Sequence, residues 1–522
     1  MNWDLLLGIS PILVVVVGGS LLMLSEAFSK LRLAPVPAGA AAALEGEHEG
    51  ERNDLAIGAA ITLFAGAIFA AAIWMYGPEK LPAVKSLEPY FVLDRFTLFF
   101  CFTLSLGGAL AALLAGGYLP EHKLDYGEFY PLLIFSAVGA MILAASADLV
   151  SLFLGLETMS LGVYAMTGFR RRSARSTEAG VKYFLLGSFA AAILVYGGAL
   201  LYGATGHTDL SGMRTAILAL TAAPAGGKLG LVVAGMVLLI VGLAFKVSAV
   251  PFHMWVPDVY EGAPTPATGF MAVVVKSAAF AILLRVLLVG FSDAGSMSWG
   301  SGWPPVVAAL AVATMTVANF TAGRQESVKR MLAYSSIAHA GYVLVGVAAT
   351  VRAGTDAQGS VLFYLLAYTF STVGAFGALV LCGSRGKEAV SFEDLAGLGR
   401  RHPVPAAFFS LFLISLAGVP PTVGFFGKLY IIKAAIGSEL YVLTVLLVLN
   451  SVLAAYYYLK VMVYMYMREP AAGAPVAVPM KSGHVVAALV VAGVIVLAMG
   501  LMPGTSLDVA VKAAITGATG GS

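Results

Sequence analysis

The sequence predicts an all-α, multi-pass membrane protein with about fourteen transmembrane helices. Of its 522 residues, 59% are hydrophobic and only 11% are charged, and the mean hydropathy is +0.90. A soluble domain has about 25% charged residues, so this chain has too few charges to form a water-exposed surface. Its 31 Lys and Arg nearly balance its 28 Asp and Glu, which argues against nucleic-acid binding.

The cysteine content and the glycine pattern exclude several kinds of site. Two cysteines, Cys101 and Cys382, exclude a disulfide framework and a cluster held by cysteines alone. No glycine-rich phosphate loop follows a strand pattern. We therefore expect this chain itself to bind no cofactor and no metal.

The predicted spans are apolar runs of about the 20 residues that a bilayer requires. Little more than Ala147 and Asp148 separates the fourth run from the fifth, and the run 405–436 is too long for one straight span. The runs cover 5–24, 55–76, 93–117, 129–146, 149–168, 178–203, 229–250, 264–290, 303–322, 328–350, 358–383, 405–436, 441–467 and 484–503.

The segments between the spans predict loops and an orientation. Residues 34–54 are rich in Ala, Gly and Glu and predict a flexible surface loop. The loops at 77–92, 204–228 and 384–404 are long enough for short interfacial helices. Lys and Arg concentrate in alternate loops, as at 170–175. Because cytoplasmic loops carry the excess of these residues, we expect both termini on the outer, periplasmic side of a bacterial inner membrane.

Several basic residues fall within the spans, although each charge at a helix centre costs about 2.5–3.5 kcal/mol. Lys276 and Lys428 lie near the middle of their runs, and Lys246 precedes a break, so these three are candidate functional residues. Snorkelling to the interface explains basic residues near span ends, and it stays an alternative for Lys182. It is the expected explanation for Arg285, Lys433 and Lys460.

Glu157 is an isolated acid about nine residues inside its span, so it should be paired or protonated. A lysine on a neighbouring helix is the obvious partner. Burial readily shifts the pKa of a lysine, whereas an arginine stays protonated. Membrane lysines accompanied by one acid therefore predict a proton relay rather than a substrate clamp.

Two proline motifs predict broken helices, each with a lysine nearby. They are AFKVSAVPFHMW, which contains Pro251, and GVPPTVGFFGK, which contains Pro420 and Pro421. Such a pair indicates inverted repeats around an ion path at the membrane midplane, although a simple proline kink is the alternative. His253 and His339 either extend the relay, since histidine titrates near neutrality, or are structural.

Five segments resemble subunit N of the proton-pumping NADH:quinone oxidoreductase, respiratory complex I. The related antiporter-like subunits carry PDA and lack the VYEGAPTP block, so the resemblance favours subunit N over them. The segments are FKVSAVPFHMWVPDVYEGAPTPATGFMAVVVKSAAFAILLR at 245–285, LFLGLETMSLGVYAM at 152–166, EAGVKYFLLGSFAAAILVYG at 178–197, VKRMLAYSSIAHAGY at 328–342 and GVPPTVGFFGKLYI at 418–431.

The resemblance implies an antiporter-like fold with two inverted five-helix repeats, at 129–290 and 303–467. An N-terminal region at 1–128, with a loop at 25–54, precedes the repeats, and a last helix and tail at 484–522 follow them. The resemblance also implies a role for particular residues. Glu157 would pair with Lys246, Lys182 and Lys276 would be connecting lysines, Lys428 would belong to the second broken helix, and His253 would follow the first break.

The implied function is proton translocation driven by quinone reduction in other subunits. The parent complex would use FMN, iron–sulfur clusters, NADH and quinone. The implied partners are the other membrane and hydrophilic subunits, including a neighbouring antiporter-like subunit, and the lipid bilayer. Two alternatives stay open: a subunit of a multisubunit cation/proton antiporter, and a non-pumping membrane scaffold.

Overall fold

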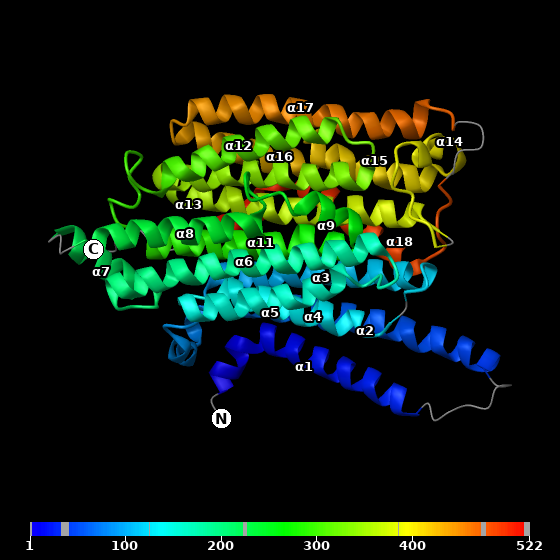
Figure 1. The fold of residues 1–522 in the computed structure, drawn as a ribbon, viewed down its shortest axis with the longest axis horizontal. Coiled ribbons are helices and arrows are strands. Elements are labelled where there is room, and N and C mark those ends of the chain that lie inside the picture. The colour runs from blue at the N-terminus through cyan, green and yellow to red at the C-terminus, as the bar shows by residue number, and fades with distance from the viewer. Residues whose placement is uncertain are drawn as a thin grey trace.

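The computed structural model describes residues 3–32, 41–124, 126–222, 227–384, 386–470 and 477–515. Most helices run side by side along the long axis of one bundle (Figure 1). In chain order they are α1 (Trp3–Arg32), α2 (Ala41–Tyr76), α3 (Arg95–Glu121), α4 (Phe129–Ala145), α5 (Leu149–Thr167), α6 (Ala174–Thr205), α7 (Leu210–Ala222), α8 (Lys228–Val247), α9 (Val256–Gly262), α10 (Thr265–Phe270), α11 (Lys276–Arg285), α12 (Trp303–Gly323), α13 (Val328–Cys382), α14 (Leu398–Arg401), α15 (Pro403–Ala417), α16 (Val423–Gly437), α17 (Tyr441–Met467), α18 (Gly483–Leu501) and α19 (Pro503–Lys512).

The number of membrane crossings agrees with the sequence. Among the described residues, 11 helical segments are long and apolar enough to cross a membrane. One of them, α13, turns back on itself at Gly354, where the backbone leaves the helical conformation, and so holds two predicted spans. With this extra span, the shorter α4 and the α15–α16 pair, the bundle accounts for about fourteen crossings.

Both predicted helix breaks are confirmed. α8 ends at Val247, Ser248 has a positive φ of 68°, and helical structure resumes at α9. α15 ends at Ala417, Gly418 has a φ of 84°, and α16 begins at Val423. A left-handed residue ends the helix at each break. Gly418 adopts this conformation without a steric penalty, whereas the Cβ of Ser248 makes it mildly strained. The narrow gap between α4 and α5 is confirmed too, because Asp148 caps α5 through the Val150 amide at 2.7 Å.

The expected loop at 25–54 is wrong wherever the structure describes it. α1 continues to Arg32 and α2 begins at Ala41, so residues 25–32 and 41–54 are helical. Residues 33–40 lie outside the described part of the chain. Ala and Glu are strong helix formers, and in 41–54 their propensity outweighs the polar composition on which the loop prediction was based.

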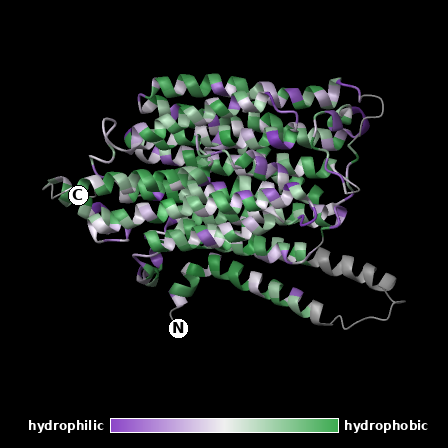
Figure 2. Ribbon diagram, viewed as in Figure 1, coloured by the Kyte–Doolittle hydropathy of each residue, from purple (hydrophilic) through white to green (hydrophobic). Residues whose placement is uncertain are grey.

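The hydropathy of the bundle suits a bilayer. Hydrophobic residues follow the lengths of the helices, whereas hydrophilic ones gather toward the ends of the bundle and at some places inside it (Figure 2). The expected short interfacial helices include α7 within 204–228 and α14 within 384–404.

Candidate functional site

The first buried lysine, Lys246, lies in the last turn of α8 and is only 2% exposed. Its Nζ donates to Ser160 Oγ at 2.8 Å and to Tyr164 OH at 3.3 Å, both on α5. Glu157, one helical turn from Ser160, interacts electrostatically with Lys246. The two form no ion pair within 4.0 Å, although both are described. Glu157 Oε1 is buried and has no hydrogen-bond partner among the described residues. Glu157 and Lys246 are therefore neighbours, as predicted, but they form no direct ion pair.

Lys182 lies at a polar mouth near one end of the bundle. Its ammonium pairs with Asp258 of α9, and Arg330 of α13 binds the other carboxylate oxygen at 2.9 Å. Together with Arg175 and Glu261, these side chains line a cavity of about 290 Å³. The next residue, Tyr183, is fully buried, and its ring centroid is 5.6 Å from Lys246 Nζ. The Tyr183 hydroxyl has no hydrogen-bond partner among the described atoms.

Lys276 begins α11, directly after a π-helical turn at Met271–Val275, and is 2% exposed. π-helical turns inside α-helices often occur at functional sites. Lys276 Nζ donates to the Ser336 carbonyl at 2.6 Å and to Ser336 Oγ at 2.5 Å. Tyr368 OH donates to the same Oγ at 2.8 Å. Lys276 therefore joins the first repeat to the two halves of α13.

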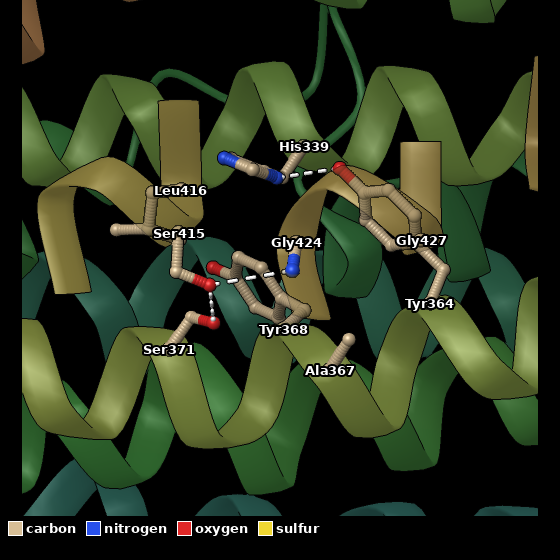
Figure 3. Close-up of a pocket in the computed structure, with 9 residues that line it drawn as sticks. All are labelled: His339, Tyr364, Ala367, Tyr368, Ser371, Ser415, Leu416, Gly424 and Gly427. Atoms are coloured by element: carbon tan, nitrogen blue, oxygen red, sulfur yellow. Dashed lines mark hydrogen bonds between the residues drawn. The ribbon is translucent and has the colours of Figure 1, made fainter. Parts of the chain in front are cut away.

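His339 forms the next polar centre, again between the two halves of α13. Its Nδ1 lies 2.6 Å from Tyr364 OH and its Nε2 lies 3.1 Å from Tyr458 OH of α17. A cavity of about 10 Å³ adjoins the ring, which is about the space that one water needs. Figure 3 shows this cavity between α13, α15 and α16. It is lined by His339, Tyr364, Ala367, Tyr368, Ser371, Ser415, Leu416, Gly424 and Gly427.

Lys428 lies on α16 after the second break and is 5% exposed. Its Nζ donates to the Ala417 carbonyl at the end of α15 at 2.8 Å and to Ser451 Oγ of α17 at 3.0 Å. The carbonyl end of a helix favours a cation. A Cβ at Gly418 would lie 2.9 Å from Lys428 Cδ, so the bare glycine leaves room for the lysine stem.

His253 stands apart from these centres. It lies in the turn between α8 and α9, and its Nδ1 is buried without a hydrogen-bond partner among the described residues. No hydrogen bond in the described part of the chain joins it to Lys276 or Lys428. The structure places Lys246 near Glu157, and it places Lys276 near His339. The role of His253 in the relay stays a prediction.

Arg285 does not snorkel, and that expectation is wrong. It is 2% exposed, and its guanidinium binds both carboxylate oxygens of Asp94 at 3.0 Å and Thr97 Oγ1 at 2.9 Å. Asp94 lies 191 residues away in the chain, so a single apolar run could not reveal the pair. Lys433, by contrast, is exposed, and Lys460 Nζ approaches the Gln325 carbonyl at 3.3 Å.

A second polar cluster, also missed, surrounds Glu388 in the segment after α13. Its carboxylate accepts from Thr265 at 2.6 Å and from Tyr118, and it pairs with Lys329 at 3.4 Å and Arg170 at 3.3 Å. Burial alone would raise the pKa of Glu388, but the charges of Lys329 and Arg170 outweigh it and lower the pKa to about 2. This cluster links α3, α10 and the start of α13 across the two repeats.

Comparisons with known proteins place the chain in a family. The family model for NADH:quinone oxidoreductase/Mrp antiporter transmembrane proteins matches residues 146–454. NADH-quinone oxidoreductase subunit N 1 of Sorangium cellulosum (strain So ce56) is 67% identical over 512 residues, which is 98% of each chain. The chain belongs to the subunit N family of NADH-quinone oxidoreductase. Subunit N of Myxococcus xanthus (strain DK1622) is 40% identical and matches 95% of this chain and 94% of its own.

Solved structures agree with subunit N membership. A chain of respiratory complex I from Thermus thermophilus with bound aureothin superposes with a TM-score of 0.73 at 32% identity, covering 95% of this chain and 98% of that one. A chain of the Mrp complex from Dietzia sp. DQ12-45-1b has a TM-score of 0.79 at 21% identity over 98% and 97% of the two chains, and shows the antiporter-like fold alone. Among the described residues, no group of His, Cys, Asp and Glu is arranged to hold a metal.

Proposed function

We propose that this subunit translocates protons in complex I along the buried residues Lys182, Lys246, Lys276, His339 and Lys428, with Glu157 as the acidic partner of Lys246. Quinone reduction in other subunits supplies the energy. The parent complex would use NADH, FMN, iron–sulfur clusters and quinone, and we assign all of these to the other subunits.

The observation that carries the proposal is a set of buried lysines without fixed acidic partners. Lys246, Lys276 and Lys428 are each at most 5% exposed, and they donate their hydrogen bonds to hydroxyl or carbonyl oxygens. A scaffold has no use for charges that cost about 2.5–3.5 kcal/mol each in a membrane. A proton carrier needs a group that can be either protonated or neutral, and a buried lysine is such a group.

We assign an order of transfer to these residues, and the hydrogen bonds between Lys276, Ser336 and Tyr368 support one part of it. A proton enters at the Asp258 mouth through Lys182 and passes to Lys246, where Glu157 stabilises the charge. Lengthening the Glu157–Lys246 separation favours release toward Lys276. Ser336 and Tyr368 connect Lys276 to the surroundings of His339, and Lys428 delivers the proton outward.

We also assign the orientation. The loop at 170–175 and the other basic loops lie on the cytoplasmic side, so both termini lie on the outer side of the bacterial inner membrane.

The test is Lys246→Ala in the assembled complex, with quinone reduction and proton uptake measured together in vesicles. Both should fall while the complex stays assembled. Lys433→Ala, an exposed lysine of α16, is the matched control and should leave both unchanged. Unchanged pumping in Lys246→Ala would contradict the relay and favour the scaffold. Co-purification with hydrophilic flavin and iron–sulfur subunits separates complex I from a multisubunit antiporter.

A further inference from the structure

Each lysine of a broken helix lies against the face of a tyrosine ring. Lys246 Nζ is 5.3 Å from the ring centroid of Tyr164, and Lys428 Nζ is 5.4 Å from that of Tyr342. Tyr164 lies on α5 and Tyr342 on the first half of α13. These helices are the second of each predicted five-helix repeat, so the two repeats place a tyrosine ring beside their lysine at corresponding positions. Lys246 also donates to the Tyr164 hydroxyl at 3.3 Å, whereas Lys428 meets the Tyr342 ring without such a bond.

Specific contacts of the hydroxyl group define the position of each tyrosine ring. Asn319 Nδ2 of α12 donates to Tyr342 OH at 2.9 Å, and Asn319 Oδ1 accepts from Tyr457 OH at 3.0 Å. In the first repeat, a Cβ at Gly187 would lie 2.1 Å from Tyr164 OH, so the bare glycine of α6 makes room for the phenol. Each tyrosine therefore has a fixed ring position.

The second repeat isolates the contribution of the ring. Lys428 is faced by His339 and Tyr342 from α13, by Ser451 from α17 and by the Ala417 carbonyl from α15. No carboxylate of the described residues pairs with it. A ring face attracts an ammonium and not a neutral amine, and the attraction increases when water is excluded.

In the first repeat, more groups surround the lysine. Glu157, Ser160 and Tyr164 from α5 and Tyr183 from α6 face Lys246, whose Nζ also lies 5.9 Å from the ring of Phe245. Loss of one ring there should be partly offset by the others. Tyr342 is therefore the residue on which the role of the ring is best measured.

We propose that Tyr164 and Tyr342 are positioning residues of proton transfer, whose rings hold the charged ammonium of Lys246 and Lys428 and release it when the lysine loses its proton. This inference rests on the proposed function. In each half of the subunit, an uncharged tyrosine ring would stabilise the protonated lysine. Because the ring forms no ion pair, it would not trap the proton on the lysine.

The test compares Tyr342→Phe with Tyr342→Leu in the assembled complex, with proton pumping measured across a pH series. Phe keeps the ring and should leave the alkaline limb of the profile within a few tenths of a pH unit of the parent. Leu removes the ring, so Lys428 should lose its proton more readily, and the alkaline limb should move to lower pH by about one unit. Phe363→Leu is the matched control, because Phe363 is an equally buried ring of α13 that packs against Tyr430 and takes no part in the Asn319 hydrogen bonds. It should leave the limb in place.

An alkaline limb that is the same in Tyr342→Leu and Tyr342→Phe would overturn the inference, and so would an equal shift in Phe363→Leu. If Tyr342→Leu prevents assembly, Tyr342→Met supplies the same comparison with a side chain that fills irregular space. Lys428→Ala separates this inference from the proposed function. Undiminished pumping in Lys428→Ala contradicts the relay itself, whereas loss of pumping there with an unshifted Tyr342→Leu profile contradicts only the role of the ring.

Discussion

The ammonium of Lys246 binds Ser160 Oγ at 2.8 Å instead of the Glu157 carboxylate one helical turn away on the same helix. The attraction between Glu157 and Lys246 is thus present without a direct ion pair. Ser160 and Tyr164 hold the lysine in a separated position, from which a small movement along α5 would bring it onto the acid. This is the arrangement that the proposed function expects of the pair when Lys246 is separated from its acid.

Ser160→Ala should shift this pair toward the closed state. Loss of the hydroxyl removes a hydrogen bond to a charged group, so Lys246 should move toward Glu157 and release its proton less readily. If about 1.4 kcal/mol is transferred to the ion pair, the pumping rate should fall about tenfold. Proton uptake by vesicles containing the assembled complex measures the effect. Ser136→Ala, which removes a buried hydroxyl bonded to the Met159 carbonyl, should have little effect on pumping; an equal loss there would point to packing instead.

Asp258→Asn should impair proton entry. Asp258 is bound by both Lys182 and Arg330 at the cavity mouth, so its neutralisation leaves two cations facing each other and repels an incoming proton. We expect pumping and coupled quinone reduction to fall several-fold in the assembled complex. The control is Glu178→Gln on the same wall of the mouth, since Glu178 is exposed and lies 4.0 Å from Lys182. Exposed pairs contribute at most about 1 kcal/mol, so this variant should pump normally. Equal effects of both variants would mean that the mouth acts only through its net charge.

His339→Ala and His253→Ala should differ. His339 joins Tyr364 to Tyr458 within 3.1 Å, whereas His253 has no link to the other candidates among the described residues. We expect loss of most proton pumping in His339→Ala and a minor change in His253→Ala, both measured by vesicle acidification with assembly checked by gel filtration. The reverse order would restore the histidine after the first break as the connecting group.

The charged members of the site were predictable from the sequence because a lysine or glutamate in an apolar run is conspicuous. Lys246, Lys276, Lys428 and Glu157 all stand out in this way, and all are buried or half-buried in the bundle. The two proline motifs likewise marked both helix breaks, since an interior proline removes a backbone hydrogen bond and kinks or breaks a helix. These features depend on local sequence alone.

The neutral members and the long-range pairs were not predictable. Ser160 and Tyr342 resemble many other residues of membrane helices, because a hydroxyl adds little cost in a span. Their partners come from other helices, and Arg285 is the clearest example, since its carboxylate partner precedes it by 191 residues. The helix at 41–54 was missed because composition and helix propensity pointed in opposite directions there.

Arg285→Met should destabilise the subunit strongly, because it leaves Asp94 without its cation near the buried start of α3. Breaking a buried pair from one side costs about 3–5 kcal/mol. The double variant Arg285→Met with Asp94→Asn should recover much of this loss, since asparagine still caps the Thr97 amide that Asp94 now caps at 2.8 Å. Thermal unfolding of the purified complex measures both. No recovery in the double variant would mean that Arg285 acts through Thr97 or the Ala144 carbonyl instead.

Glu388→Gln should lower stability at neutral pH, with an effect that disappears in acid. The folded-state pKa of Glu388 is lowered to about 2, below the usual value near 4.3. A depressed carboxyl pKa stabilises the fold at pH values above the unfolded pKa, and that stabilisation is lost as the pH falls toward the folded one. The apparent melting temperature of the purified complex should therefore differ between parent and variant at pH 7, and less than half of the difference should survive at about pH 3. Glu393→Gln, an exposed acid of the same segment, should show no difference at either pH. A difference for Glu388→Gln that is constant from pH 7 to pH 3 would mean that the carboxylate charge does not hold Lys329 and Arg170 in place.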